Sequence, residues 1–218
     1  PGGNRVKAVG GQLDYMLNLH NAFGGINPDR WFWLNGVAGV GYNYTTDAMH
    51  VHKHVFGGGL GLQANLRLTR ELALTVEPRV DLYDDSYAQH ASSFRGKMDV
   101  VPSLLAGLAY TYHGRSQSAK PTDEFSSLAW HDHTFIEAGV GANVMLARRP
   151  LNDMGNYLMP QIYVGVGKWF TPVSGLRLWG QVAKTQWSDA DDRYTHLTVG
   201  AGYLLNLTNA FYGYRVCD

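Results

Sequence analysis

The sequence predicts an all-β fold, an antiparallel up-and-down transmembrane β-barrel of about eight strands, with eight to ten as the range. Three observations predict it. Apolar and polar residues alternate with period two along most of the chain, no apolar run approaches the roughly 18 to 20 residues of a membrane-spanning helix, and charged residues are scarce. A chain that crosses a membrane without such a helix crosses it as a closed barrel.

Composition supports the same class of protein. Charged residues make up 17% of the 218 positions, whereas soluble proteins average about 25%. The 26 glycines, 13 tyrosines, 8 phenylalanines and 6 tryptophans are typical of β-proteins whose rings lie at an interface. The formal net charge of zero gives no electrostatic basis for binding nucleic acid. We expect one barrel domain over residues 1–218, without a cofactor.

The strands follow one another in order along the chain. The first two are predicted at 6–21 and 31–45. The clearest alternation comes next, over 56–83, where two strands flank the short link Arg70-Glu71 and form a hairpin with one apolar and one polar face. Its apolar positions are Phe56, Leu60, Leu62, Ala64, Leu66 and Leu68, then Leu72, Leu74, Val76, Pro78, Val80 and Leu82.

The same pattern predicts five further strands, at 98–113, 133–147, 157–170, 175–188 and 194–209. In the last of them, apolar residues from Leu197 to Leu207 share one face, and His196, Thr198 and Gly200 lie on the other. Each strand is long enough for the roughly 9 to 11 tilted residues that cross a bilayer.

The connections fall into two classes on opposite sides of the barrel. One side has the short links 24–29, 70–71 and 171–174, and the other has longer polar loops at 46–55, 84–97, 148–156 and 188–192. Short periplasmic turns opposite longer external loops are typical of outer-membrane barrels. The connection 114–132 is long although it lies on the short side, so it is a candidate seam between two halves.

The apolar face is predicted to point outward, although alternation alone would also fit a soluble barrel with an apolar interior. The apolar face is almost free of charge, and the polar face is rich in Gly, Asn and Gln instead of Lys and Glu. Aromatic residues gather near strand ends, as in the two interfacial girdles of membrane barrels. The predicted girdle residues are Trp31, Trp33, Tyr42, Tyr44, Tyr110, Tyr112, Trp169, Phe170 and Trp187.

A repeated segment indicates an architecture of equivalent units. The sequence from Tyr15 to Gly25 returns from Tyr203 to Gly213, 188 residues further along. Eight predicted strands fit inside this period, which is the size of the smallest closed membrane barrel. Nine strands in total is odd, whereas bacterial single-chain barrels use even numbers. Either the end strands close a ring of eight or ten, which we favour, or the chain is part of a larger or tandem barrel.

Two turn motifs carry a family resemblance. Residues 18–30, Asn-Leu-His-Asn-Ala-Phe-Gly-Gly-Ile-Asn-Pro-Asp-Arg, and 167–177, Gly-Lys-Trp-Phe-Thr-Pro-Val-Ser-Gly-Leu-Arg, resemble motifs of the Bacteroidetes-type OmpA-like outer-membrane barrels. The resemblance implies an eight-stranded barrel in the outer membrane of a Gram-negative bacterium, without catalytic residues. The second motif usually precedes the first, and here only the repeated copy at 203–213 follows that order.

Charged residues on the polar face predict a salt-bridge network in the lumen, because an unpaired charge in a confined interior is costly. With eight strands a filled interior is favoured, whereas a wider barrel would form a pore whose charges select ions. The predicted network consists of Asp14, Arg67, Glu77, Arg79, Asp81, Glu137 and Arg177.

A weaker hypothesis is a metal site. His50, His52 and His54 alternate in the predicted external loop, so their imidazoles share one face if the loop is extended, and His196 on the same side of the membrane is a candidate fourth ligand. The alternative interpretation, which we favour, is a histidine-rich polar loop without a metal.

The functional prediction is a non-enzymatic structural protein or accessory subunit of an envelope complex. Its expected partners are outer-membrane lipid and lipopolysaccharide, and other outer-membrane or periplasmic proteins. The first alternative is a diffusion porin. A less favoured one is a hydrolase at the external rim, where carboxylates and a histidine could activate water but no nucleophile motif accompanies them. Its candidate residues are Asp84, Asp85, His90, Asp189, Asp191 and Asp192.

Overall fold

The fold is seen in a computed structural model of the chain. The structure describes residues 5–19, 31–46, 52–84, 98–112, 133–144, 158–171, 174–186 and 193–205. Within these ranges we find no helix with the length and apolar character that spanning a membrane requires.

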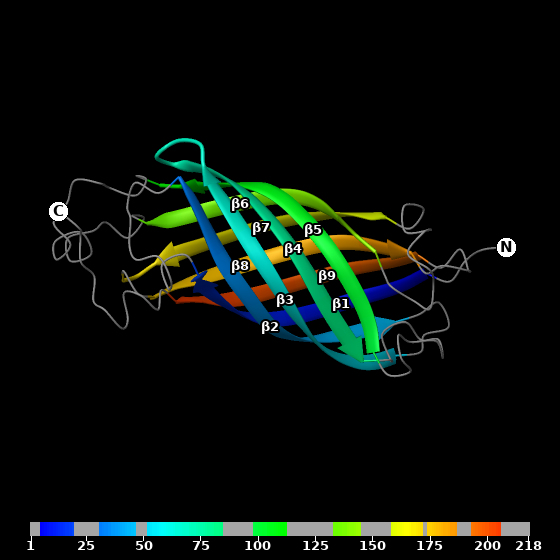
Figure 1. Ribbon diagram of the computed structural model, residues 1–218. Helices are drawn as coiled ribbons and strands as arrows, with labels where there is room; N and C mark the ends of the chain where they lie inside the picture. The colour runs from blue at the N-terminus through cyan, green and yellow to red at the C-terminus, as the bar shows by residue number, and fades with distance from the viewer. Residues whose placement is uncertain are drawn as a thin grey trace.

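Nine strands form one closed barrel in which sequence neighbours are neighbours in space (Figure 1). The predicted all-β, up-and-down barrel is therefore confirmed. The predicted bounds agree within a few residues, except that the third strand begins at His52 and not at Phe56. The strands are β1 (Arg5–Asn18), β2 (Phe32–Thr46), β3 (His52–Arg67), β4 (Leu72–Asp84), β5 (Met98–Thr111), β6 (Thr134–Asn143), β7 (Met159–Trp169), β8 (Ser174–Gln186) and β9 (Arg193–Leu205).

The ring closes through a parallel pair. β1 and β9 run in the same direction and pair from Arg5 with Arg193 to Leu17 with Leu205, whereas all other neighbours are antiparallel. Parallel closure permits an odd number of strands, so the described ring has nine, which is within the predicted range of eight to ten. The pairing register equals the sequence repeat: Tyr15 lies opposite Tyr203, its counterpart 188 residues further along. The described first residues of the two copies, Tyr15 to Leu17 and Tyr203 to Leu205, therefore lie side by side.

This closure can be tested by cross-linking. Val9 and Leu197 are register partners on β1 and β9, and both side chains point outward. In a Cys217→Ser background, we expect Val9→Cys with Leu197→Cys to form a disulfide on oxidation, because side chains of directly paired residues lie within bonding reach. Changed electrophoretic mobility, reversed by reductant, would report the link. Val9→Cys with Val182→Cys, one strand further away, is the control, and equal cross-linking of both pairs would contradict the closure.

The hairpin turns identify the two ends of the barrel. At the β3–β4 turn the backbone N–H of Leu72 donates to Oγ1 of Thr69 at 3.0 Å, and at the β7–β8 turn the N–H of Ser174 donates to Oγ1 of Thr171 at 2.9 Å. We call the end that carries these turns, where β1, β3, β5, β7 and β9 finish, the short-turn end. The opposite end is the long-loop end. The predicted seam at 114–132 lies outside the described residues.

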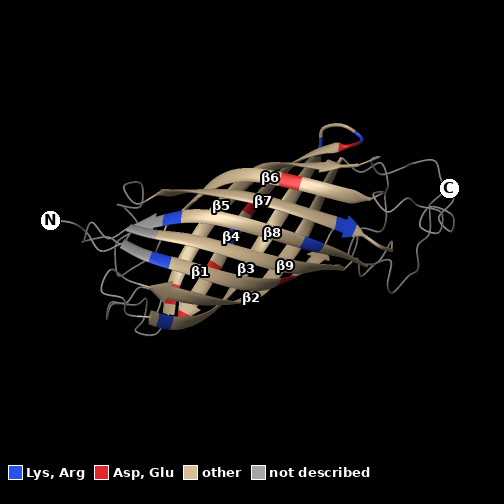
Figure 2. Cartoon of the chain, turned by 180° about the vertical axis from the view of Figure 1, so that it is seen from behind, with Lys and Arg blue, Asp and Glu red and all other residues tan. Residues whose placement is uncertain are grey.

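The barrel is apolar outside and polar inside, as the alternation predicted. Leu13, Val40, Phe56 and Leu60 keep 65–67% of their surface exposed, although they lie in the middle of strands. Charged residues occupy few positions along the strands (Figure 2). The buried polar and charged side chains are Asp14, Asn43, Thr45, Gln63, Asn65, Glu77, Arg79, Asp99, Glu137, Asn143, Gln161, Arg177, His196 and Thr198.

Glycines on the inward face make room for the large side chains. Around the lumen, inward positions of neighbouring strands form rows in which one or two glycines separate the large residues from β6 to β4. Small residues beside large ones are how a narrow barrel is filled. One row reads Phe135, Gly167, Arg177, Gly202, Asp14, Gly39, Gly59, Asp81 and Val101, and another reads Glu137, Gly165, Trp179, Gly200, Gln12, Gly41, Gly57, Tyr83 and Asp99.

Candidate functional site

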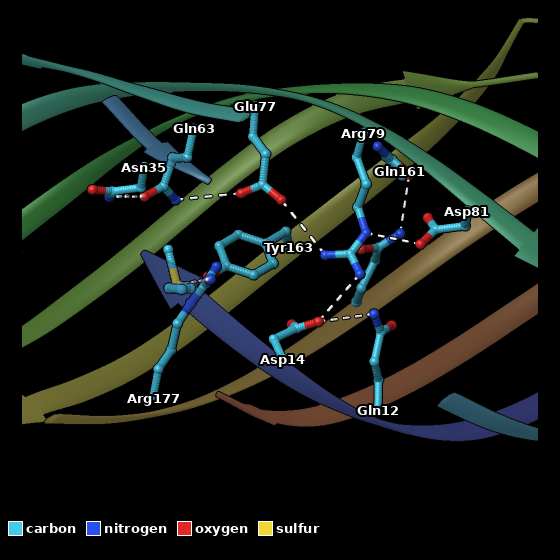
Figure 3. Close-up of polar contacts among 12 residues, drawn as sticks. Gln12, Asp14, Asn35, Gln63, Glu77, Arg79, Asp81, Gln161, Tyr163 and Arg177 are labelled. Atoms are coloured by element: carbon cyan, nitrogen blue, oxygen red, sulfur yellow. Dashed lines mark hydrogen bonds and ion pairs between the residues drawn. The ribbon is translucent and has the colours of Figure 1, made fainter. Parts of the chain in front are cut away.

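The centre of the lumen holds an arginine surrounded by three carboxylates (Figure 3). The guanidinium of Arg79, on β4, lies 2.8 Å from Asp81, 3.2 Å from Asp14 and 3.6 Å from Glu77. Asp14 belongs to β1, so its ion pair with Arg79 joins strands that are three positions apart in the ring. Gln12 donates a further hydrogen bond to Asp14 at 2.9 Å. We call Arg79, Asp14, Glu77 and Asp81 the Arg79 cluster.

Two glycines allow this ion pair to form. Gly39 on β2 and Gly59 on β3 are register partners, and they lie between β1 and β4. A Cβ on Gly39 would collide with the Asp14 carboxylate, and one on Gly59 would collide with the carboxylate of Asp81. The missing side chains leave the space that the guanidinium and its carboxylates occupy.

A second arginine is bound on the opposite wall. Arg177, on β8, donates from Nε to the carboxylate of Glu137 and from Nη2 to the hydroxyl of Tyr163. That hydroxyl donates to the same carboxylate, so the three side chains form a closed triangle. Arg177 also donates to Sδ of Met16 at 3.2 Å, and its guanidinium carbon lies 5.1 Å from the centre of the Tyr163 ring. Because all three polar members are buried, the ion pair is enclosed in the barrel.

Amides extend the network toward the short-turn end. Asn35 donates to Oε1 of Gln63 at 3.0 Å, and Gln63 donates to Glu77 at 3.3 Å (Figure 3). Six of the seven predicted lumen charges therefore lie in the two arginine clusters. The seventh, Arg67, ends β3 half-buried, and its backbone N–H donates to the carbonyl of Trp31 at 2.7 Å.

The two ends of the lumen differ in character. Toward the short-turn end, Met16, Val37 and Leu204 form a buried apolar cluster against which Phe135 and Trp169 pack. Toward the long-loop end the interior is mixed: the buried residues include the polar Asn43, Thr45 and Gln161 and the apolar Val55 and Ala183. There His196 lies 3.0 Å from Oδ1 of Asn43.

Most of the predicted girdle aromatics face outward. Trp31, Tyr110, Tyr112 and Phe170 are exposed near the short-turn end, and Tyr42 and Tyr44 are exposed near the long-loop end. Two do not fit the prediction. Trp169 packs inside the barrel, and Trp33 shares the inward parity of Asn35 and Val37. The reason is the strict alternation of a strand. Each of these tryptophans is adjacent in sequence to an outward-facing residue, so its own side chain lies on the inner face. Trp187 lies outside the described residues.

The structure separates the predicted histidine ligands. His52 and His54 lie on β3 and face outward, where His52 stacks on Tyr44 and His54 bonds the hydroxyl of Tyr42. His196 faces the lumen, so the barrel wall separates it from both. His50 lies outside the described residues. Among those described, no three His, Cys, Asp or Glu side chains are grouped so as to hold a metal ion.

Of the predicted rim residues, only Asp84, the last residue of β4, lies within the described part of the chain. Two important lumen residues were not predicted. Tyr163 and Trp179 are buried inside the barrel with their rings 6.3 Å apart. The alternation along each strand could have found them, because both residues fall on the polar, inward face. Their aromatic character points instead to an outward position.

No family model, no curated protein and no solved structure matches the chain. The site and the fold are therefore the basis for any functional assignment.

Proposed function

We propose that this chain is an integral outer-membrane β-barrel protein with a filled lumen, which serves as a structural or accessory subunit of the cell envelope and not as an enzyme or a diffusion porin. The observation that supports this proposal most strongly is that side chains bonded to one another lie inside the barrel. Ion pairs and hydrogen bonds inside the lumen link strands two or three positions apart in the ring: β1 with β4, β6 with β8, and β8 with β1.

The outer wall supports the membrane location. Apolar side chains cover the middle of every strand on the outward face, which is the reverse of a soluble barrel. An exposed apolar surface of this extent would cause aggregation in water, and lipid is the solvent that matches it. The turn motifs at 18–30 and 167–177, which resemble those of Bacteroidetes-type OmpA-like barrels, support the outer membrane as the location.

The interior favours a plug over a pore. The large residues of the lumen alternate with glycines, which is the packing expected when side chains fill a narrow barrel. The apolar cluster of Met16, Val37 and Leu204 with Phe135 and Trp169 lies across the short-turn end. A diffusion pore would instead need a continuous polar path for hydrated solutes.

Planar-bilayer recording tests this function. We expect the purified chain to insert without producing stable single-channel conductance, because Arg79, Arg177 and the side chains bonded to them lie inside the lumen. The matched variant is Arg79→Ala with Trp169→Ala, which removes one side chain from the centre and one from the short-turn end. We expect intermittent conductance from this variant.

Stable single-channel conductance from the wild-type chain would contradict a filled lumen and support the porin alternative. A chain that stays in the aqueous phase, with no heat-dependent shift in electrophoretic mobility after mixing with lipid vesicles, would contradict the membrane location itself.

A further inference from the structure

One row of the outer wall combines positive charge with hydroxyl groups. Consecutive register pairs connect Lys184 on β8, Thr195 on β9, Lys7 on β1, Thr46 on β2 and His52 on β3. Four of the five side chains are exposed and Thr46 is half-buried, all on the outward face. We call these five residues the basic row. Figure 2 shows basic positions near the long-loop end, on the left of that view.

The basic row lies at the border of the apolar band. One step toward the barrel centre, the outward positions of β8, β9 and β1 are Val182, Leu197 and Val9, all exposed apolar residues. Because neighbouring strands are about 4.8 Å apart, the row spans roughly 19 Å along the wall. Its position matches the depth at which lipid headgroups meet acyl chains.

Among the described residues, no acid on the outward face of these strands opposes the two lysines. The outward residues of β8, β9, β1 and β2, within the described ranges, include neither Asp nor Glu. No ion pair joins Lys7 or Lys184 to any residue that the structure describes. The basic row is therefore available to an anion from outside the protein.

An apolar hollow begins two outward positions below the row, beyond Val182, Leu197 and Val9. Its lining includes Leu178, Gly180, Val199, Gly11 and Leu13. A Cβ on Gly11 would meet no atom nearer than 3.9 Å, and one on Gly180 none nearer than 4.0 Å, so the glycines leave open space over the strands. The combination of cations at the border and open apolar space below fits an amphiphile that has an anionic headgroup and acyl chains.

We propose that the basic row and the hollow form a binding site for the phosphorylated headgroup and an acyl chain of lipopolysaccharide, a proposal that rests on the outer-membrane location proposed above. Lys7 and Lys184 bind phosphate oxygens. Thr195 adds a hydrogen-bond donor, and so does the pair Thr46 and His52, whose Oγ1 and Nδ1 lie 3.1 Å apart. The acyl chain packs over Gly11 and Gly180. Phospholipid phosphate shares this chemistry, but the long-loop end faces the exterior in outer-membrane barrels, where lipopolysaccharide is the phosphorylated lipid.

Binding of defined lipids to the full chain in detergent micelles tests this site. The probe is bisphosphorylated lipid A, and dephosphorylated lipid A is the matched lipid control. Each lysine near an anionic surface contributes about fivefold in affinity, so we expect Lys7→Ala with Lys184→Ala to weaken binding about 30-fold. Lys168→Ala, which removes a lysine near the short-turn end, should leave the affinity unchanged.

The outcomes separate the two proposals. Equal binding of phosphorylated and dephosphorylated lipid A, or unchanged affinity of the double variant, would overturn the basic row while leaving a membrane-inserted barrel. Equal competition by a phosphatidylglycerol vesicle would overturn the assignment to lipopolysaccharide. Failure of the wild-type chain to insert into vesicles would overturn the proposed function and the site with it.

Discussion

Replacing Arg79 by alanine is expected to lower the free energy of unfolding by about 3 to 5 kcal/mol, because breaking a buried ion pair leaves its partners charged and uncompensated. Asp14, Asp81 and Glu77 all lie within 3.6 Å of this guanidinium. Without it, Asp14 and Asp81 remain in a confined space and lose the ion pair that each makes in the structure. Urea unfolding of the barrel in lipid vesicles, followed by tryptophan fluorescence, measures the difference.

Two control variants separate charge from lost packing. Arg70→Ala makes the same substitution at an exposed position of the β3–β4 turn, where we expect a change within about 0.5 kcal/mol. Adding Asp14→Asn and Asp81→Asn to Arg79→Ala removes two of the stranded charges and should restore part of the stability. If Arg79→Ala proves as mild as Arg70→Ala, the lumen is hydrated and the plug interpretation fails.

The strands were predictable because alternation is a local signal. From Leu72 to Asp84, for example, the inward and outward sets follow from sequence parity, and the structure begins and ends β4 within one residue of the prediction. The same parity placed Glu77, Arg79 and Asp81 on one face. Their partner Asp14 also fell on the polar face of its own strand, so the composition of the Arg79 cluster could be predicted.

The remaining features depend on packing across the lumen or on ring closure, which local patterns do not report. Trp169 has the residue type of a girdle but the parity of the interior, and in this case parity prevails because a strand cannot turn one side chain to the other face without a bulge. Parallel closure was not foreseen either. The repeat at Tyr15 and Tyr203 was visible in the sequence, but not that its two copies would be register partners.

The second large effect that we expect is a loss of stability when an arginine is placed at the centre of the outer wall. Leu60 lies in the middle of β3 with 67% of its surface exposed and no role in the lumen. If lipid surrounds the barrel, Leu60→Arg places a charge near the middle of the bilayer and costs about 2 to 4 kcal/mol. If water surrounds it, an exposed leucine exchanged for arginine changes stability by less than about 0.5 kcal/mol.

The matched control makes the same leucine-to-arginine substitution nearer the end of the barrel. Leu68 follows β3 at the short-turn end and is 55% exposed, so Leu68→Arg places the charge near the membrane interface, where its cost is about 0 to 1 kcal/mol. Unfolding free energies of both variants in vesicles give the depth dependence directly. Equal values would remove the main argument for a membrane-embedded wall, because both side chains are exposed and a lipid environment would make their depths unequal.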